Sequence, residues 1–321
     1  MWEAFEHNLK DPAGAAIPFF LLFMLIEMAS IRNEAKHDRK EADAATGAPG
    51  GTAVRGYLRA DTRASLTMFV ASIGFSAVFR TAAFLLYTVI YVHLAPWHLS
   101  ASNPWTWVGV ILGVDLLWYT YHRFAHRVRI GWAGHQAHHS SEYMNYGTAL
   151  RQKWNPWFEF FFWLPLPLLG FAPWTLYVAF GVNLIFQFFV HTEMIDKMWK
   201  PIELIFNTPS HHRVHHGSDP EYLDKNYAGI LIIWDRMFGT FTAERQRPTY
   251  GLTYKVDTYN LLKLQYGDYV QMARDVRSTK RFRDKLGYVF GPPGWAPEHQ
   301  VGGKDAERQL AHEAEIALHK S

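Results

Sequence analysis

The stretch HQAHH, residues 135–139, holds three imidazoles within five positions. Two similar stretches accompany it, HRFAH at 122–126 and HHRVHH at 211–216. On a helix, residues three or four positions apart lie on one face, so each stretch directs two or three imidazoles toward one place. Imidazoles packed together lose hydration and gain nothing in return unless they bind a ligand. The three stretches therefore predict a fold that brings them together around metal.

The number of clustered histidines indicates two metal ions. A zinc site usually takes three or four protein ligands, so eight histidines exceed the need of one ion. His211 adjoins His212 and is expected to face elsewhere, in the surroundings of the site. The predicted ligands are His122, His126, His135, His138, His139, His212, His215 and His216, with His191 as a ninth.

The type of metal follows from the residues that the chain has and lacks. It contains no cysteine, so any metal must be bound by histidine or carboxylate. It has no HExxH motif of a zinc protease, and it lacks the two ExxH motifs of a soluble carboxylate-bridged di-iron bundle. Two metals with mostly nitrogen ligands at a membrane surface fit iron that activates O2. Such a centre can attack an unactivated C–H bond of an acyl or alkyl chain.

Five apolar runs precede or separate the histidine stretches, at 13–31, 64–95, 105–121, 157–171 and 174–190. The first is long enough to span a bilayer, and its positive charges follow it, which predicts a retained anchor and not a cleaved signal peptide. The second could be one long tilted helix or two segments meeting near Arg80. We expect an all-α integral membrane bundle with about four or five membrane segments. Residues 192–260 should form a helical cap over the dimetal site.

Basic residues predict the orientation of this bundle. They gather between the first and second runs and between the third and fourth, whereas 96–104 and 170–173 have no lysine or arginine. By the positive-inside rule the basic loops are cytoplasmic. If the second run crosses once, all the histidine stretches and His191 fall on the cytoplasmic side.

Three polar residues in the apolar runs are candidates for the surroundings of the metals. Asp115 lies two helical turns before His122 and could accept the second N–H of a ligand imidazole, or could pair with Arg80 across the bundle. Asn183 and Gln187 precede His191 at a spacing of four. They could serve the site, since polar groups in membrane segments are usually functional, or could join helices by hydrogen bonds.

The order HxxxH, HxxHH, HxxHH after a hydrophobic hairpin resembles the fatty acid hydroxylase / sterol desaturase superfamily of integral membrane di-iron oxygenases. The resemblance spans roughly 110–255. Three further stretches are similar to the alkylglycerol monooxygenase branch: FNTPSHHRVHHG (206–217), YLDKNYAGILIIWDRMFGTF (222–241) and YGLT (250–253). Bacterial ornithine-lipid hydroxylases share much of the pattern. In the stretch 222–241, Asp224, Asn226 and Asp235 could fix loops or contact the ligands.

The resemblance implies O2-dependent hydroxylation of a lipid chain, an ether lipid in that branch. It implies ligands at the eight clustered histidines, with His191 where such proteins often carry a further one. Two iron ions are the implied metals, which zinc can replace in purified protein. A tetrahydropterin is the implied electron donor. We see no fused cytochrome b5 or iron–sulfur module, so a separate donor is expected.

The resemblance divides the chain into three parts. Residues 1–63 would be an N-terminal anchor helix and basic cytoplasmic loop, with a flexible segment at 44–54. Residues 64–260 would be the membrane di-iron hydroxylase domain with its cytoplasmic cap. Residues 261–321 would be a polar C-terminal extension, loosely ordered from about Arg277.

Two other functions fit part of this pattern. A lipid or sterol desaturase would use the same site, because ligand spacing does not separate the two reactions. A membrane metal-binding or transport protein would need ionisable residues along a path across the bilayer, and the runs contain few. A net charge of +3 argues against a nucleic-acid partner. The sequence leaves the oligomeric state open.

Overall fold

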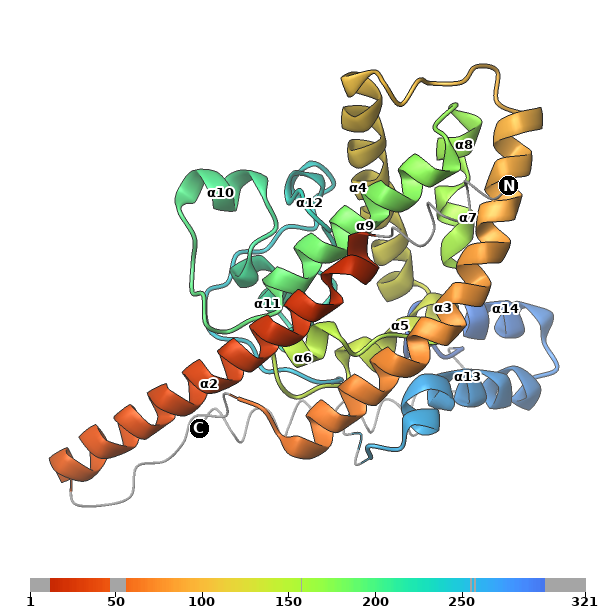
Figure 1. Cartoon of the computed structure of the whole chain (residues 1–321). Helices are drawn as coiled ribbons and strands as arrows, with labels where there is room; N and C mark the ends of the chain where they lie inside the picture. Colours follow the sequence, from red (N-terminus) through yellow and green to blue (C-terminus); the bar gives the residue numbers. More distant parts are fainter. Residues whose placement is uncertain (1–11, 47–55, 157, 255, 257, 298–321) are drawn as a thin grey trace.

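The structure is a computed structural model that describes residues 12–46, 56–156, 158–254, 256 and 258–297 (Figure 1). These residues form helices and no strands, which confirms the all-α prediction; two isolated β-bridges join Phe206 to Leu231 and Gly217 to Tyr250. The helices are α2 (Pro12–Thr46), α3 (Arg59–His93), α4 (Pro104–Arg127), α5 (Arg129–His139), α6 (Tyr146–Ala149), α7 (Glu159–Trp163), α8 (Pro165–Leu168), α9 (Pro173–Val190), α10 (Lys200–Ile205), α11 (Pro209–His216), α12 (Ile233–Met237), α13 (Leu261–Ser278) and α14 (Phe282–Phe290).

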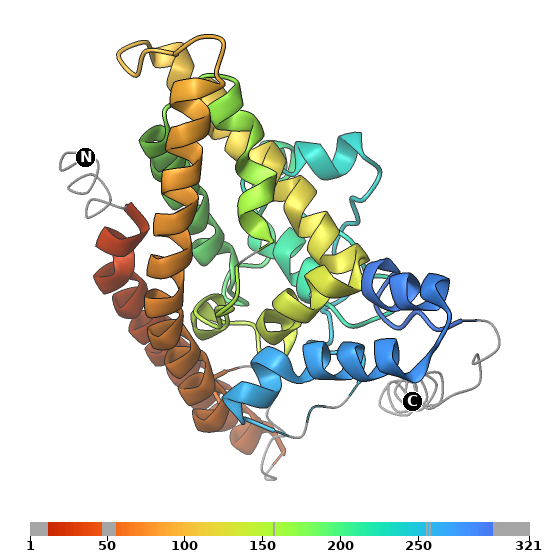
Figure 2. The ribbon, with the colours of Figure 1, turned by 90° about the vertical axis from the view of Figure 1, so that its right-hand side faces the viewer.

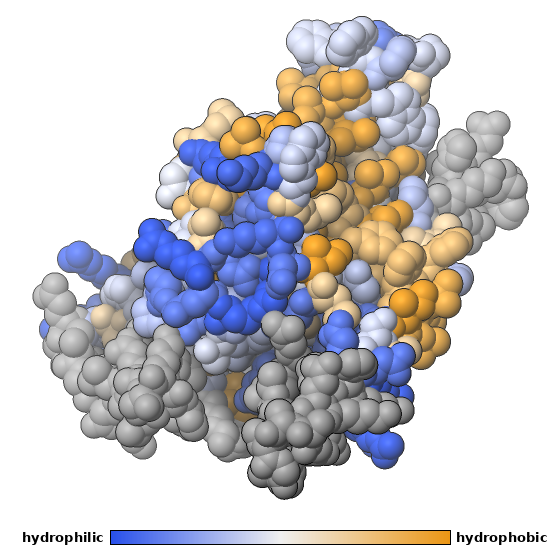
Figure 3. All heavy atoms as spheres, turned by 90° about the vertical axis from the view of Figure 1, so that its left-hand side faces the viewer, coloured by the Kyte–Doolittle hydropathy of each residue, from blue (hydrophilic) through white to orange (hydrophobic). Residues whose placement is uncertain are grey.

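Three helices of the described chain are long and apolar enough to cross a membrane: Pro12–Glu34 of α2, α3 and α9. The alternatives for the second apolar run are resolved, because α3 is one continuous helix through Arg80. Its 35 residues extend about 52 Å, more than the roughly 30 Å of a hydrocarbon core. Figure 3 shows a band of hydrophobic side chains between paler residues at the top and hydrophilic side chains in the lower part.

The fourth apolar run is not the straight helix that a single span would need. It consists of the short helices α7 and α8, which meet at Pro165. Proline has no N–H and its ring clashes with the preceding turn, so the helix breaks there. The two pieces still carry the chain to the far end of the bundle. There Trp97 Nε1 donates to the carbonyl of Leu169 (3.0 Å), and Leu99 N donates to that of Gly170 (2.9 Å).

These contacts place the two connections that lack basic residues, 96–104 and 170–173, at one end of the bundle (Figures 1 and 2). Gly170 has φ +83°, and a Cβ there would lie 2.4 Å from the carbonyl oxygen of Trp97. Only glycine fits this position. From this end α4 and α9 run to the opposite end, where they reach His122 and His191.

The interior of the bundle joins α3, α4, α7, α8 and α9 around one apolar core. Its buried residues are Ala83, Tyr87, Val110, Val114, Trp118, Trp163, Leu166, Leu176 and Ala179. A second core packs α2 on α9, where Phe20 stacks on Phe188 at 4.2 Å between ring centroids. The first core fixes α4 and α9 relative to each other, and the second fixes α2 against α9.

Residues after Arg277 are more ordered than we expected from their polar composition. α14 occupies 282–290 and packs against α13 and α5, and α13 runs below α5 (Figure 2). Arg129 of α5 pairs with Asp275 of α13 at 2.5 Å, and Trp295 packs on Tyr288. The loose ordering is therefore wrong for α14, which packs against α13 and α5 and at whose end the Gly291 carbonyl accepts from the backbone N–H of Arg129 (2.9 Å). The flexible segment at 44–54 and the tail after 297 lie largely outside the described residues.

Candidate metal centre

Nine histidines converge at the ends of α4 and α9 in two groups. In each group the nearest ring nitrogens all lie within 4.8 Å of one another. The first group contains His122, His126, His135, His139 and His215, and the second contains His138, His191, His212 and His216. These are the nine residues that the sequence indicated. Each group has enough nitrogen atoms to bind one metal ion.

Helix periodicity explains how the three stretches divide between the groups. Histidines four positions apart stay together: His122 with His126, His135 with His139, and His212 with His216. The intervening histidines, His138 and His215, join the opposite group. Each stretch thus directs two imidazoles toward one place, as expected, but in α5 and α11 the third histidine joins the other group. Both short helices contribute to both groups and hold them side by side, with the rings of His139 and His216 stacked at 4.3 Å.

Backbone carbonyl groups orient four of the imidazoles. The Nδ1–H groups of His122, His138, His191 and His215 donate to the carbonyls of Tyr227 (2.9 Å), Arg151 (3.3 Å), Gln187 (2.7 Å) and Lys225 (3.1 Å). A carbonyl only accepts, so Nδ1 carries the proton and Nε2 has a free lone pair. A hydrogen bond at the outer nitrogen fixes ring and tautomer in metal sites.

The pair His138–His191 tests whether metal fits. Both rings donate through Nδ1, yet their Nε2 atoms lie 3.2 Å apart. Two lone pairs at this distance repel each other unless a cation lies beside both. With metal–nitrogen bonds of about 2.0–2.1 Å, two ligands at a right angle have nitrogens roughly 3 Å apart. The separation therefore suits two ligands of one ion.

Unpartnered nitrogens point to the same conclusion. Among the described residues, Nε2 of His126, His215 and His216 and Nδ1 of His212 are buried without a hydrogen-bond partner. Buried polar atoms normally have one. His212 faces its group through Nε2, 2.9 Å from His191 Nε2, but the Nε2 atoms of the other three indicate a ligand that accepts lone pairs, which a metal ion does.

Burial keeps these imidazoles neutral. It lowers the pKa of His135, His138, His139, His212 and His216 well below the ordinary value, and neighbouring histidines lower it further. Burial also lowers the pKa of His191 to about 3 and that of His215 to about 4. At neutral pH the rings therefore present lone pairs to a cation and do not repel it.

Asp115 has neither of the partners considered from the sequence. Its carboxylate accepts from the backbone N–H groups of Ile230 (2.7 Å) and Leu231 (3.0 Å), from Trp234 Nε1 (2.8 Å) and from Asn183 Nδ2 (2.9 Å). No histidine and no Arg80 contact is among these bonds. A buried carboxylate needs several donors, and the turn at 230–234 supplies them. Asp115 thus fastens this turn to α4.

Asn183 and Gln187 form a polar stripe on α9 that continues from the Asp115 carboxylate to His191. Asn183 joins α9 to α4, as the helix–helix alternative predicted, and its oxygen accepts from the amide of Gln187. The main-chain carbonyl of Gln187, not its side chain, contacts His191. The stripe is thus one connected network that ends at the second group.

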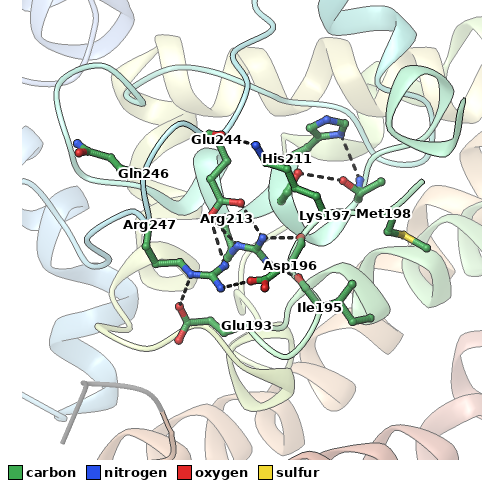
Figure 4. A network of polar contacts seen from close by, with 12 residues as sticks. Glu193, Ile195, Asp196, Lys197, Met198, His211, Arg213, Glu244, Gln246 and Arg247 are labelled. Atoms are coloured by element: carbon green, nitrogen blue, oxygen red, sulfur yellow. Dashed lines mark hydrogen bonds and ion pairs between the residues drawn. The ribbon is translucent and has the colours of Figure 1, made fainter. Parts of the chain in front are cut away.

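His211 faces away from both groups, as expected. Its Nε2 lies 3.0 Å from the Glu203 carboxylate, and its Nδ1 lies 3.2 Å from the carbonyl oxygen of Phe206. The adjacent Arg213 was not singled out from the sequence. It is fully buried and binds Glu244 (2.6 Å) and the carbonyls of Ile195 (2.6 Å) and Asp196 (2.7 Å) (Figure 4). It ties α11 to the segment that follows His191.

The loop that follows α11 contacts histidines of the first group and fixes their orientation. Asp235 accepts from the backbone N–H groups of Tyr227 and Ala228, both at 2.8 Å, and so fixes the carbonyl that binds His122. Asn226, at φ +55°, donates to the carbonyls of His211 and Thr242. Asp224 pairs with Arg127 at 2.7 Å and lies 3.9 Å from His126 Nδ1. No sequence pattern identifies which carbonyl groups accept from the imidazoles, because every residue carries a backbone carbonyl.

Comparison with known proteins links this site to a family. Residues 107–240, which contain all nine histidines, match the fatty acid hydroxylase model. The chain is 40% identical over 296 residues to human alkylglycerol monooxygenase, covering 90% of this chain and 61% of that protein. It is 47% identical over 203 residues to the Danio rerio protein of the same name, covering 63% and 44%.

A more distant relative is the ornithine lipid hydroxylase of Rhizobium tropici, 33% identical over 136 residues and 38% of each chain. No solved structure matches the chain. The chain spans roughly half the length of the alkylglycerol monooxygenases it matches, between 44% and 61% for the two named above.

Proposed function

We propose that this protein is a membrane-bound oxygenase that hydroxylates the alkyl chain of a lipid, because residues 107–240 match the fatty acid hydroxylase model and the chain is similar to alkylglycerol monooxygenases. One oxygen atom of O2 enters a C–H bond, and the other leaves as water with two electrons and two protons from a donor. The observation that carries the proposal is the pair of neutral, converging histidine groups at the end of apolar helices.

Each group would hold one iron ion, and together the two ions would supply the chemistry that activates O2 toward an aliphatic C–H bond. The protein's own part is to position and to shield. The carbonyls of Tyr227, Arg151, Gln187 and Lys225 aim Nε2 inward. Burial of the rings excludes water, which keeps the imidazoles unprotonated and protects a reactive centre from side reactions.

The finer features of the proposal concern substrate, donor and orientation. The names of the relatives favour an alkylglycerol, an ether lipid, as the substrate. A tetrahydropterin would be the separate electron donor. The metal centre would lie on the cytoplasmic side, under a cap formed by 192–260. Residues 1–63 would form the anchor helix and basic loop, 64–260 the hydroxylase domain and 261–321 the C-terminal extension.

The test is to measure iron and product in the same preparations. We expect purified protein to contain about two iron ions per chain and to add one oxygen from labelled O2 to an alkylglycerol. His138→Ala removes one of four ligands of the second group and should lower iron content and abolish product together. His93→Ala, an exposed histidine far along α3, should change neither.

Full hydroxylation by His138→Ala at normal iron content would show that His138 is not a ligand. A product that has lost two hydrogens and gained no oxygen would identify a desaturase that uses the same site. A protein that binds metal but yields no product with any lipid would reject the proposal.

A further inference from the structure

The last described helix, α14, exposes a stripe of large apolar side chains. Phe282, Leu286 and Phe290 are spaced by four positions and therefore lie on one face of the helix. Their exposed fractions are 73%, 42% and 56%. Asp284 and Tyr288 lie on the opposite face and are buried. Apolar groups of this size on one face of a short helix indicate contact with an apolar partner.

Basic residues surround this stripe. From 274 to 285 the chain has six basic and two acidic residues, a surplus of four positive charges. Asp275 pairs with Arg129 of α5, and Asp284 is buried and accepts from Thr279 Oγ1 (3.1 Å). All the basic residues except Lys285 are exposed. They are Arg274, Arg277, Lys280, Arg281, Arg283 and Lys285.

α14 is attached where α4 leaves the apolar bundle. The backbone N–H of Arg129, two residues after the end of α4, donates to the carbonyl of Gly291, and its guanidinium lies over the ring of Tyr288. The apolar run of α4 ends at Tyr121, six residues or about 9 Å before the end of that helix. In Figure 2, α14 lies above α13, beside the lower end of α4. This is the depth at which the surface of the bilayer is expected.

We propose that α14 lies in the surface of the bilayer and binds anionic phospholipid. Phe282, Leu286 and Phe290 then lie among the acyl chains, and the surrounding basic residues contact the phosphate headgroups. Helices with an apolar face and lysine or arginine around it bind anionic lipid in this way. The partner is anionic phospholipid of the leaflet at the metal-centre end of the bundle. This role goes beyond the proposed oxygenation and does not depend on it.

The contact with lipid is tested by fluorescence quenching of the full chain in nanodiscs. The chain has no cysteine, so a single Leu286→Cys can carry a nitrobenzoxadiazole dye. The nanodiscs contain brominated phosphatidylglycerol or, at the same mole fraction, brominated phosphatidylcholine. We expect the emission to shift to shorter wavelength, as in an apolar environment. We also expect phosphatidylglycerol to quench more strongly than phosphatidylcholine, because the basic residues concentrate it beside α14.

The matched control is a dye on the neighbouring helix. Gly267 of α13 is exposed, and a Cβ there would have no atom within 4 Å, so Gly267→Cys fits without strain. Its position is opposite to that of Gln265, a buried residue of the same helix. We expect neither brominated lipid to quench a dye at this position, because it faces away from the bundle.

The basic residues are tested by the triple variant Lys280→Gln, Arg281→Gln and Arg283→Gln in the Leu286→Cys chain. Each cation near an anionic surface favours binding about fivefold, so the excess quenching by phosphatidylglycerol should disappear. High salt should do the same. Quenching by phosphatidylcholine should remain, because the apolar stripe is unchanged. The control variant has glutamine at three exposed basic positions elsewhere and should keep the excess: Lys200, Arg245 and Lys263.

Three outcomes would overturn the inference. Equal quenching by the two lipids in the chain with all its basic residues would mean that the stripe contacts lipid without binding anionic headgroups. A shifted emission that neither lipid quenches would mean that protein covers the stripe, such as a segment of 298–321. An unshifted emission would mean that the stripe faces water. The measurement needs no turnover, so its failure would leave the proposed function intact, and an inactive protein would leave this inference intact.

Discussion

At the scale of single residues, the protonation pattern of the imidazoles explains why this site needs a cation. His138 and His191 each donate a proton outward to a carbonyl and face each other with lone pairs 3.2 Å apart. The second group has one ligand fewer than the first, four against five. Loss of one histidine should therefore affect the two groups differently.

We predict that His139→Ala leaves four ligands in the first group and retains more iron than His138→Ala, which leaves three. His211→Gln should retain the wild-type amount, because His211 binds Glu203 and not the groups. Iron per chain, measured after dialysis against a chelator, checks this order. If His211→Gln lost as much iron as His138→Ala, the assignment of His212 and not His211 to the second group would be wrong.

At the scale of elements, the short helices α5 and α11 supply histidines to both groups. A buried ion pair fixes the position of α11. α11 has only eight residues, too few to be stable without tertiary contacts. Arg213 in its middle is fully buried and bonded to Glu244 and to the 192–196 segment. The same side chain therefore fixes the helix and the backbone that follows His191.

We predict that Arg213→Met destabilises the protein by about 3–5 kcal/mol, because it leaves the Glu244 carboxylate buried without its main partner. Iron content should fall as well. Adding Glu244→Met should recover part of the stability, since the uncompensated charge is then gone. Thermal unfolding of the two variants in the same detergent is the measurement. A double variant less stable than Arg213→Met alone would contradict this account.

At the scale of the whole molecule, the first helix is joined to the site. Glu27 of α2 accepts from Tyr57, from Thr192 next to His191, and from the backbone N–H of Tyr146 (2.9 Å). An acidic residue in a membrane segment is tolerated only with such partners. α2 therefore supports the backbone next to His191 of the second group, in addition to being an apolar helix.

We predict that Glu27→Leu accelerates iron loss from the second group, because Thr192 and Tyr146 lose their shared acceptor. Glu27→Gln keeps an acceptor oxygen and should have a smaller effect. The rate of iron transfer to a chelator, compared with exposed Glu34→Gln, checks the prediction. Identical rates for Glu27→Leu and the wild type would mean that α2 contributes nothing to the site.

The proposed orientation also belongs to this scale. The chain has no cysteine, so single cysteines can be labelled without background. We predict that an impermeant maleimide labels Ser102→Cys in intact cells but labels Asp196→Cys only after permeabilisation. Both positions are exposed, Asp196 at 84% of its side chain. The opposite pattern would place the metal centre outside the cell.

The sequence by itself determined which residues converge. The nine histidines could be named because helix spacing is local, and their number among apolar runs predicted metal. The helical class followed from apolar runs long enough to span a bilayer. The spacing of four predicted from the sequence alone that His122 shares a helix face with His126, and His212 with His216.

Only the tertiary structure decided how those residues are shared and supported. The assignment of His138 and His215 to opposite groups depends on how α4, α5, α9 and α11 pack. The partners of Asp115 and the carbonyls behind four imidazoles come from segments far away in the chain. Periodicity fixes which side chains share a face, but the contact of one face with another depends on packing over long sequence separations, and no local pattern records it.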